Sequence, residues 1–142
     1  MAEDNVAKSR RLIDEAFSRG NLDVMDELCA QDFVNHDAIA GDQDRATAKD
    51  SIAAYRAAFP DLHFTIEDAF AADDKVVMRW HGEGTFENEF MGLEPTGDVG
   101  SPVKGISIDR YEDGEIAESW SQWDTLTFLR DIGAVRQEAS VS

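Results

Sequence analysis

The sequence predicts an α+β domain in which N-terminal helices pack on a curved, mostly antiparallel sheet. Three observations lead to this fold class. Apolar residues recur at helical intervals in the first third of the chain, they alternate with polar residues through most of the remainder, and a short helical pattern closes the C-terminal part. A length of 142 residues suits one domain, which we expect over residues 1–135. A curved sheet covered by helices leaves a cone-shaped pocket suited to a small ligand.

Three helices are predicted in the first third of the chain. Apolar residues keep helical spacing over residues 6–17, and Gly20 follows where a left-handed C-terminal cap is expected. A second, short helix is expected over 22–29, with its apolar side chains on one face. A third helix is predicted over 45–59, because Pro60 restricts the backbone just beyond it.

Strands are predicted from period-two alternation of apolar and polar residues. They cover residues 62–67, 75–86, 103–111 and 115–123, and they follow a short extended or looped stretch over 32–37. The tripeptide Glu112-Asp113-Gly114 suits a three-residue hairpin loop, with Gly114 in the left-handed region. The Gly- and Pro-rich residues 91–100 are predicted to be a loop.

Helical spacing returns over residues 125–132 and ends at Gly133. We therefore expect a short C-terminal helix, followed by a frayed polar tail over residues 136–142.

Composition excludes several classes of partner. Thirty acidic residues against 13 basic ones leave a formal charge of −17, which is unsuited to nucleic acid or to an anionic lipid surface. A single cysteine, Cys29, excludes an intramolecular disulfide framework and a Cys-rich metal site, and no two histidines have the spacing of a helical zinc site. The acidic N-terminus is not typical of a secretory signal, and no apolar run reaches bilayer-spanning length. We expect a soluble protein of a reducing cytoplasm, with no metal.

Four stretches of the chain occur in the order and with the spacing of a known family. They are Gly20-Asn21-Leu22-Asp23 with Asp32-Phe33-Val34-Asn35-His36-Asp37; Ala58-Phe59-Pro60-Asp61-Leu62; Gly84-Thr85-Phe86 with Phe90-Met91-Gly92-Leu93-Glu94-Pro95-Thr96-Gly97; and Tyr111-Glu112-Asp113-Gly114-Glu115-Ile116 ending at Trp120 and Trp123-Asp124. Together they resemble the SnoaL-like polyketide cyclases, or ester cyclases, of the nuclear-transport-factor-2-like superfamily. The resemblance covers residues 6–134.

The resemblance implies a cone-like α+β barrel with its pocket inside the cone, usually in a homodimer or homotetramer. Characterised members close a ring by intramolecular aldol condensation on a polyketide ester, with an Asp at the end of the last strand as general acid and base and with no metal or organic cofactor. The superfamily also includes ketosteroid isomerases, dehydratases and epoxide hydrolases, so the resemblance does not determine the reaction.

Asp124 occupies the position that matches the family's catalytic Asp. Proton abstraction beside a carbonyl needs a carboxylate whose basicity is raised by an apolar wall, which Trp120 could supply from the same strand. The alternative is that Asp124 is the N-cap of the C-terminal helix, where donated hydrogen bonds would lower its pKa instead.

Arg110 and Glu118 are predicted to be diagonal neighbours across the last hairpin, on the inner face with Trp120 and Asp124. A charged pair on an inner face is either a structural ion pair or part of a site, in which Arg110 would stabilise an enolate oxygen or bind an ester and Glu118 would contact the substrate. Some aldol cyclases have a histidine where this chain has Arg110.

Asn35 and His36 lie where the family has a pocket-facing Asn/Asp-His stretch. Neutral His36 could relay a proton, and Asn35 could donate to an enolate; the alternative is a turn held by local hydrogen bonds.

Further substrate contacts are expected from aromatic and Met side chains, although such residues also pack in ordinary cores. We expect Trp80 to be core or pocket wall, and four residues to line the mouth of the cone: Tyr55, Phe59, Phe90 and Met91.

The leading functional hypothesis is therefore a cofactor-independent cyclase or isomerase acting on a hydrophobic carbonyl compound. One alternative is a hydrolase, for example of an epoxide, which needs an acid and a base within reach of one water. The other is a non-catalytic ligand-binding or dimerisation domain. An enzyme predicts a closed pocket bordered by the Asp124 carboxylate, whereas a binding module predicts that Asp124 bonds only to helix amides.

Overall fold

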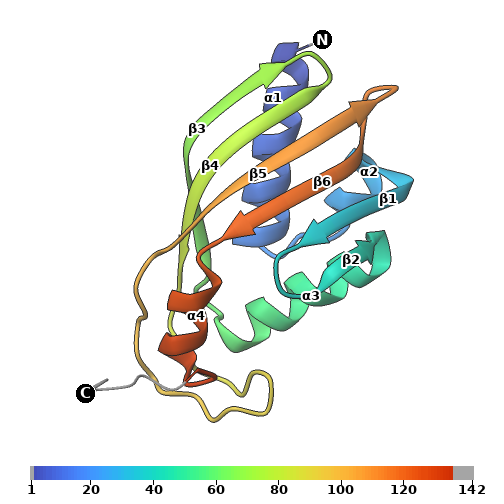
Figure 1. Cartoon of the computed structure of the whole chain (residues 1–142). Coiled ribbons are helices and arrows are strands. Elements are labelled where there is room, and N and C mark those ends of the chain that lie inside the picture. Colours follow the sequence, from blue (N-terminus) through green and yellow to red (C-terminus); the bar gives the residue numbers. More distant parts are fainter. Residues whose placement is uncertain (1, 136–142) are drawn as a thin grey trace.

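The computed structural model describes residues 2–135, so the tail predicted over 136–142 lies outside the described residues (Figure 1). The elements in chain order are α1 (Ala2–Leu12), the π-helix η1 (Ile13–Ser18), α2 (Val24–Leu28), β1 (Cys29–Asp37), β2 (Gly41–Asp44), α3 (Arg45–Ala58), β3 (His63–Ala72), β4 (Lys75–Glu83), β5 (Val103–Glu112), β6 (Glu115–Trp123) and α4 (Thr125–Ile132).

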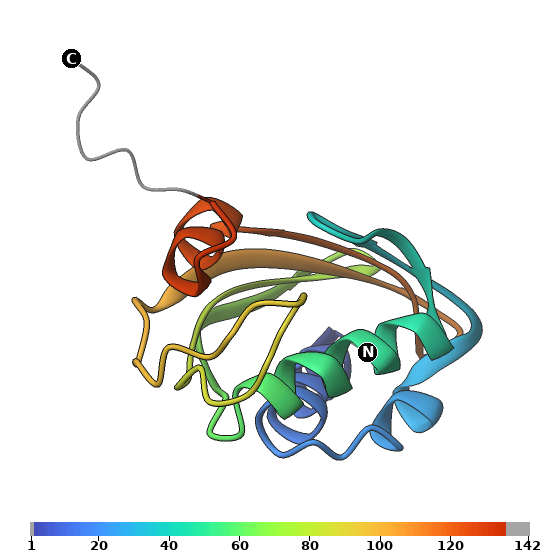
Figure 2. The same cartoon turned by 90° about the horizontal axis from the view of Figure 1, so that it is seen from below.

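One six-stranded sheet has the order β2-β1-β6-β5-β4-β3. Its neighbours are antiparallel except for β1 and β6, which are parallel. Register shifts in β3 and at the β5–β6 hairpin bend the strands, as β-bulges do. The sheet arches over α1 and α3 on its concave side, and α4 and the β4–β5 loop lie together at one end (Figure 2). The α+β cone predicted from the sequence is confirmed.

The core has two parts. The larger cluster packs α1, η1, α2 and α3 against the concave face of the sheet, with Ala16, Val76 and Ile116 fully buried at its centre. The smaller cluster joins the end of α3 to α4 and the β4–β5 loop through Phe59, Phe86 and Phe128. The two clusters together pack the helices against the sheet and against the β4–β5 loop.

Local signals placed the turns and helix ends correctly, with some changes of detail. Asp113 and Gly114 have φ of 52° and 80°, so the β5–β6 connection is a two-residue turn of the I′ kind instead of a three-residue loop. Gly133 ends α4 with φ 87°, as expected. The stretch predicted over 32–37 belongs to the longer strand β1, and β2 was not predicted.

No helix of the described chain has both the length and the apolar character needed to cross a membrane.

Candidate active site

A cavity of about 540 Å³ lies between the concave face of the sheet and the helices that cover it. Its walls are mainly apolar, and they come from both layers: Ile13, Met25, Ile52, Phe64, Met78 and Trp80. Volumes of about 300–1,000 Å³ are typical of small-molecule sites. The cone therefore encloses a cavity large enough for a small molecule and is not a filled core.

Aromatic side chains surround one end of the cavity. Tyr55 and Phe59 line it, as predicted, and Trp123 contacts Tyr55 edge-on at a ring separation of 6.4 Å. The ring of Phe90 packs against that of Tyr55 in a tilted arrangement, with centroids 5.0 Å apart, and Phe90 does not line the cavity. Met91 does not line the cavity and is 60% exposed. Direct substrate contact by Phe90 or Met91 would need the β4–β5 loop to move.

Polar side chains cross the concave face in a row, one from each of four neighbouring strands, which we call the inner polar row: Gln43, Asn35, Ser119 and Asp109. Asn35 Nδ2 donates to Gln43 Oε1 at 3.1 Å, and Gln43 Nε2 donates to Ser51 Oγ on α3 at 2.6 Å. Ser119 Oγ donates to Asp109 Oδ1 at 2.7 Å. The row is internally bonded and borders the cavity along its length.

A second polar row lies one pleat nearer the aromatic end and comprises Asp37, Ser121 and Ser107. Trp80 Nε1 donates to Ser107 Oγ at 2.9 Å, and the two serine hydroxyls are 3.4 Å apart. This pattern makes Trp80 both an apolar wall and a positioned donor.

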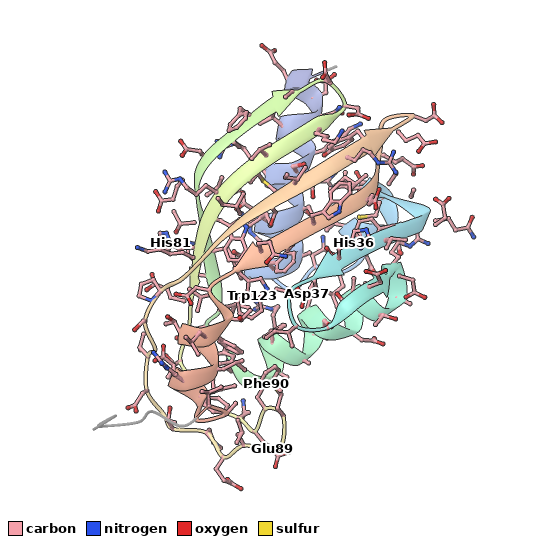
Figure 3. All side chains as sticks on the ribbon, viewed as in Figure 1. His36, Asp37, His81, Glu89, Phe90 and Trp123 are labelled. Atoms are coloured by element: carbon pink, nitrogen blue, oxygen red, sulfur yellow. The ribbon has the colours of Figure 1, made fainter. Side chains whose placement is uncertain are left out.

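Asp37 ends β1 and is half-buried at the cavity wall. Its Oδ2 accepts from the backbone N–H groups of Ile39 and Ala40, each at 2.9 Å. Its Oδ1 accepts only a long bond, 3.4 Å, from Trp123 Nε1 (Figure 3). The nearby Tyr55 has its pKa raised to about 12, mainly by burial and further by the negative charge of Asp37. Asp37 thus offers a cavity-facing oxygen with spare acceptor capacity.

Asp109 is a carboxyl group at the most buried part of the cavity lining, with 3% of the residue exposed. Burial raises its pKa, and the hydrogen bonds with Ser119 and Ser9 only partly oppose that rise. Ser9 Oγ of α1 lies 2.7 Å from Asp109 Oδ2 and also 2.7 Å from the hydroxyl of Tyr111.

Other carboxyl groups border the cavity at its loop end: Glu83, Asp98 and Asp131. Glu83 and Asp98 are exposed, and Asp131 accepts from the backbone N–H of Ser101 at 2.9 Å. Among residues 2–135, no three His, Cys, Asp or Glu side chains are grouped so as to hold a metal ion.

Asp124 caps α4, as the alternative to its catalytic role predicted. Thr127 donates its hydroxyl to Oδ2 at 2.7 Å and its N–H to Oδ1 at 3.2 Å, and these two bonds hold the pKa of Asp124 below its usual value. The expected rise in basicity is therefore wrong. Asp124 does not line the cone; it borders an open groove on the outer face with His81 and Lys104.

The inner-face placement predicted for Arg110, Glu118 and Trp120 is also wrong. Because Asp109 and Ser119 point into the cavity, the residues next to them in sequence point to the convex face. Arg110 lies directly opposite Glu118, not diagonally, because the register shifts at the hairpin. The structural ion pair predicted as the alternative is confirmed, with Arg110 Nε 3.2 Å from Glu118 Oε1.

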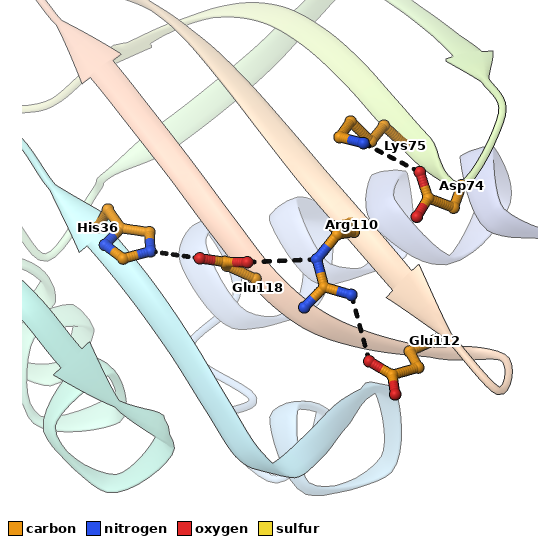
Figure 4. Close-up of polar contacts among 6 residues, drawn as sticks. All are labelled: His36, Asp74, Lys75, Arg110, Glu112 and Glu118. Carbon is orange, nitrogen blue, oxygen red and sulfur yellow. Dashed lines mark hydrogen bonds and ion pairs between the residues drawn. The ribbon is translucent and has the colours of Figure 1, made fainter.

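His36 joins the same outer-face network (Figure 4). Its Nε2 is 2.6 Å from Glu118 Oε2 and its Nδ1 is 2.7 Å from Asp42 Oδ1, and these two carboxylates raise the pKa of His36. In turn His36 and Arg110 lower the pKa of Glu118. Trp120 stacks on the His36 ring at 5.5 Å. Of the inner-face contacts expected from this group, only Asn35 reaches the cavity.

Sequence reasoning missed Asp37, Asp109 and Ser9. The alternation in β5 contained the necessary signal, because Ser107 and Asp109 share one face while Ile106 and Ile108 share the other. Apolar residues usually face the core, but Ile106 and Ile108 in the middle of β5 face outward.

The curved sheet, the covering helices and the apolar cavity with polar rows define a cone-shaped domain whose interior has the size of a small-molecule site. The sequence model of the SnoaL-like polyketide cyclase family matches residues 7–132, so the chain belongs to that family. Comparison with the curated proteins found no match.

Solved structures with the same fold come from several bacteria. IdmH of Streptomyces antibioticus, a candidate polyketide cyclase, is 32% identical over 89% of this chain and 96% of its own, with a TM-score of 0.76. AclR of Streptomyces galilaeus, a candidate hydroxylase, is 23% identical over 96% and 100%, with a TM-score of 0.84. A candidate SnoaL-like polyketide cyclase of Jannaschia sp. CCS1 is 24% identical over 95% of both chains, with a TM-score of 0.84.

Proposed function

We propose that this chain catalyses ring closure of a hydrophobic polyketide-like ester or ketone inside the cone, by acid–base chemistry and without a metal or organic cofactor. The observation that carries the proposal is the apolar cavity of about 540 Å³ with a carboxylate, Asp37, on its wall beside amide and hydroxyl groups. Apolar walls hold the carbon skeleton, while the polar rows orient its oxygens.

Asp37 is the proposed general base. Its Oδ1 takes a proton from the carbon beside a carbonyl, and the electron pair of that C–H bond moves to form an enolate. Amide and hydroxyl donors of Asn35 and Ser121 stabilise the enolate oxygen. The enolate carbon then attacks a second carbonyl of the same molecule, and the alkoxide formed takes back the proton held by Asp37.

Roles for Asp124, His36 and Arg110 stay predictions from the family resemblance. All three lie outside the cavity lining, so each would act only if the ligand reached the outer face or if the end of β6 moved. The same assay separates these roles from that of Asp37.

The test is exchange of the α-proton of a β-keto ester probe into D₂O, followed by NMR with purified protein. Asp37→Asn keeps an acceptor oxygen for the turn amides but removes the base, so we expect exchange to fall about 10²–10⁴-fold. Asp124→Asn is the matched control and should retain exchange. Loss of exchange in Asp124→Asn but not in Asp37→Asn would refute the assignment to Asp37.

Binding of the probe with no exchange in the wild-type chain would favour the non-catalytic ligand-binding domain. That outcome would be measured by titrating the probe against the intrinsic fluorescence of Trp80 and Trp123, which line the cavity.

We further propose that the chain forms a homodimer or homotetramer, as the family resemblance implies. Light scattering coupled to size-exclusion chromatography would measure the assembly mass, and a monomer at micromolar concentration would contradict the proposal.

A further inference from the structure

A buried chain of hydrogen bonds connects the cavity to α1. It runs from Ser119 to Asp109 (2.7 Å), then to Ser9 (2.7 Å), to Tyr111 (2.7 Å) and to the backbone carbonyl oxygen of Asn5 (2.9 Å). Apart from the Asn5 carbonyl, every member of this chain is a buried side chain. The proposed base, Asp37, is not part of it.

The number of protons along this chain of hydrogen bonds indicates the protonation state of Asp109. A carbonyl oxygen only accepts, so the single hydroxyl proton of Tyr111 lies toward Asn5. The tyrosine oxygen then accepts from Ser9 and uses the only hydroxyl proton of Ser9. The remaining contact, Ser9 Oγ to Asp109 Oδ2, contains a proton only if Asp109 supplies it.

If Asp109 were ionised, either the Ser9–Asp109 contact or the Ser9–Tyr111 contact would contain no proton. Two oxygen lone pairs would then face each other at 2.7 Å in a buried site, which is unfavourable.

Among the described residues, only the hydroxyl groups of Ser9 and Ser119 stabilise the charged form of Asp109, and burial outweighs them. The titratable groups whose pKa the charge of Asp109 affects are Tyr111 on its own strand and Cys29 at the start of β1. Burial raises the pKa of both, that of Cys29 to about 12, so both are neutral at pH 7. From α1 and β6 it meets only the hydroxyls of Ser9 and Ser119, and no cation of residues 2–135 lowers its pKa.

We propose that Asp109 is a neutral carboxylic acid at pH 7 with its proton on Oδ2 toward Ser9, so that Oδ1 accepts from Ser119 and the oxygen of Ser119 is left to bind a ligand hydroxyl group in this part of the cavity. The Ser119 proton is directed to Asp109 Oδ1, and the lone pairs of its oxygen remain for the ligand. The matching ligand group is an enol, phenol or alcohol. This inference rests on the proposed function only in placing the ligand in the cone, and it requires no turnover.

The first experiment tests the protonation state. Infrared difference spectra of wild type against Asp109→Asn at pH 7 should contain the band of a protonated carboxylic acid. Tyr111→Phe removes the acceptor of the Ser9 proton, so Ser9 can donate to Asp109 and that band should disappear at a lower pH than in wild type. A spectrum with only the carboxylate band at pH 7, or an unchanged titration in Tyr111→Phe, would overturn the proposal.

The second experiment tests the ligand class with a matched pair of probes, 2-naphthol and 2-methoxynaphthalene. Wild type should bind the naphthol about 3- to 10-fold more tightly, the effect of one neutral hydrogen bond. Ser119→Ala should abolish this preference and leave the methoxy compound unaffected. Asp109→Asn should keep the preference, because its amide also accepts from Ser119 and donates to Ser9.

Equal binding of the two probes by wild type would overturn the acceptor role of Ser119. If the infrared and binding experiments give the expected results but the wild-type chain does not exchange the α-proton, the proposed function would be refuted and this inference would stand.

Discussion

Strand β4 and strand β5 lie side by side in one sheet but turn opposite kinds of side chain toward the helices. In β4 the apolar residues Met78 and Trp80 point inward and Arg79 points outward, as in an ordinary half-buried strand. In β5 the acidic Asp109 points inward at 3% exposure, while Ile106 points outward at 50% exposure. The partner strand β6 follows β5, because residues directly opposite each other share a face.

The difference separates a part of the sheet that buries apolar side chains from a part that buries hydrogen-bonded polar side chains. Burying a polar group costs free energy unless the group is hydrogen-bonded. We call β5 and β6 the inverted strands, because polar side chains of both face inward. They meet that condition: in the part of the chain that the structure describes, every buried side-chain N or O atom has a hydrogen-bond partner. A sheet needed only for packing gains nothing from such a network, and this inversion is the feature on which the proposed ligand site depends.

The largest effect should come from comparing apolar truncations in the two strands. Met78→Ala removes a side chain that is 1% exposed, and we expect a loss of about 2–5 kcal/mol in the free energy of unfolding. Ile106→Ala is the matched control on β5 and should cost less than about 1 kcal/mol, because that residue is half exposed. Urea denaturation measures both. Equal losses would show that the two strands do not differ in packing.

A smaller loss is expected when the inner polar row is interrupted. Asp109→Leu fills similar space but leaves the hydroxyls of Ser9 and Ser119 without their shared partner, which should cost about 1–3 kcal/mol. Asp109→Asn preserves both bonds and should cost clearly less. If leucine were tolerated as well as asparagine, the network would not be what stabilises the inverted strands.

The pH dependence of stability gives a separate test of the same residue. Burial raises the pKa of Asp109 in the folded state above its unfolded value, so the folded state binds the proton more tightly. The contribution of Asp109 to the free energy of unfolding is complete below the unfolded-state pKa of about 3.9 and is lost as pH rises through the folded-state pKa. Between these two pKa values the loss is about 1.4 kcal/mol per pH unit. Asp109→Asn should remove this dependence of the free energy of unfolding on pH, measured by urea denaturation at several pH values. An identical slope in wild type and variant would contradict the raised pKa of Asp109.

A modest effect is expected at the end of β6, where Asp124 caps α4. Asp124→Ala should lower the unfolding temperature slightly, whereas Asp124→Asn should lower it less because asparagine also caps helices. The pKa of Asp124 is lowered in the folded state, so its contribution is present at neutral pH and is lost as pH falls through that lowered value. Thermal unfolding between pH 7 and pH 2 would show the loss in wild type and its absence in Asp124→Ala.

The smallest effect should come from the outer face. Glu118 and Asp42 raise the pKa of His36, so the stabilisation from this network is complete below the ordinary pKa of histidine, about 6.5, and is lost as pH rises through the raised value. Thermal melts across pH 6–9 should show a slight decline that His36→Asn lacks. The decline should also shrink at high salt, since exposed ion pairs are screened. A decline that persists in His36→Asn would belong to another group.

Helix ends and the hairpin turn could be predicted because they depend on single residues. Gly133 ends α4 in the left-handed region, and the Asp113-Gly114 pair forms the β5–β6 turn. Strand β2 could not be predicted, because its sequence Gly41–Asp44 has no alternation of apolar residues and becomes a strand only through pairing with β1. Of the candidate site, Tyr55, Phe59 and Trp80 were predicted from their aromatic side chains and Asn35 from the family resemblance, and all four line the cavity.

The sequence by itself determined the order of the helices and strands other than β2, the family, and the alternation of two faces along β5 and β6. The tertiary structure decided which of those faces turns inward. A period of two separates side chains into two sets but does not label either set as core, and the choice depends on partners distant in the chain, such as Ser9 of α1 for Asp109. The same dependence gave Asp124 the role of helix cap and buried Asp109 on β5. Hydrogen bonds from Thr127 lower the pKa of Asp124, whereas burial raises that of Asp109, and the fold supplies both environments.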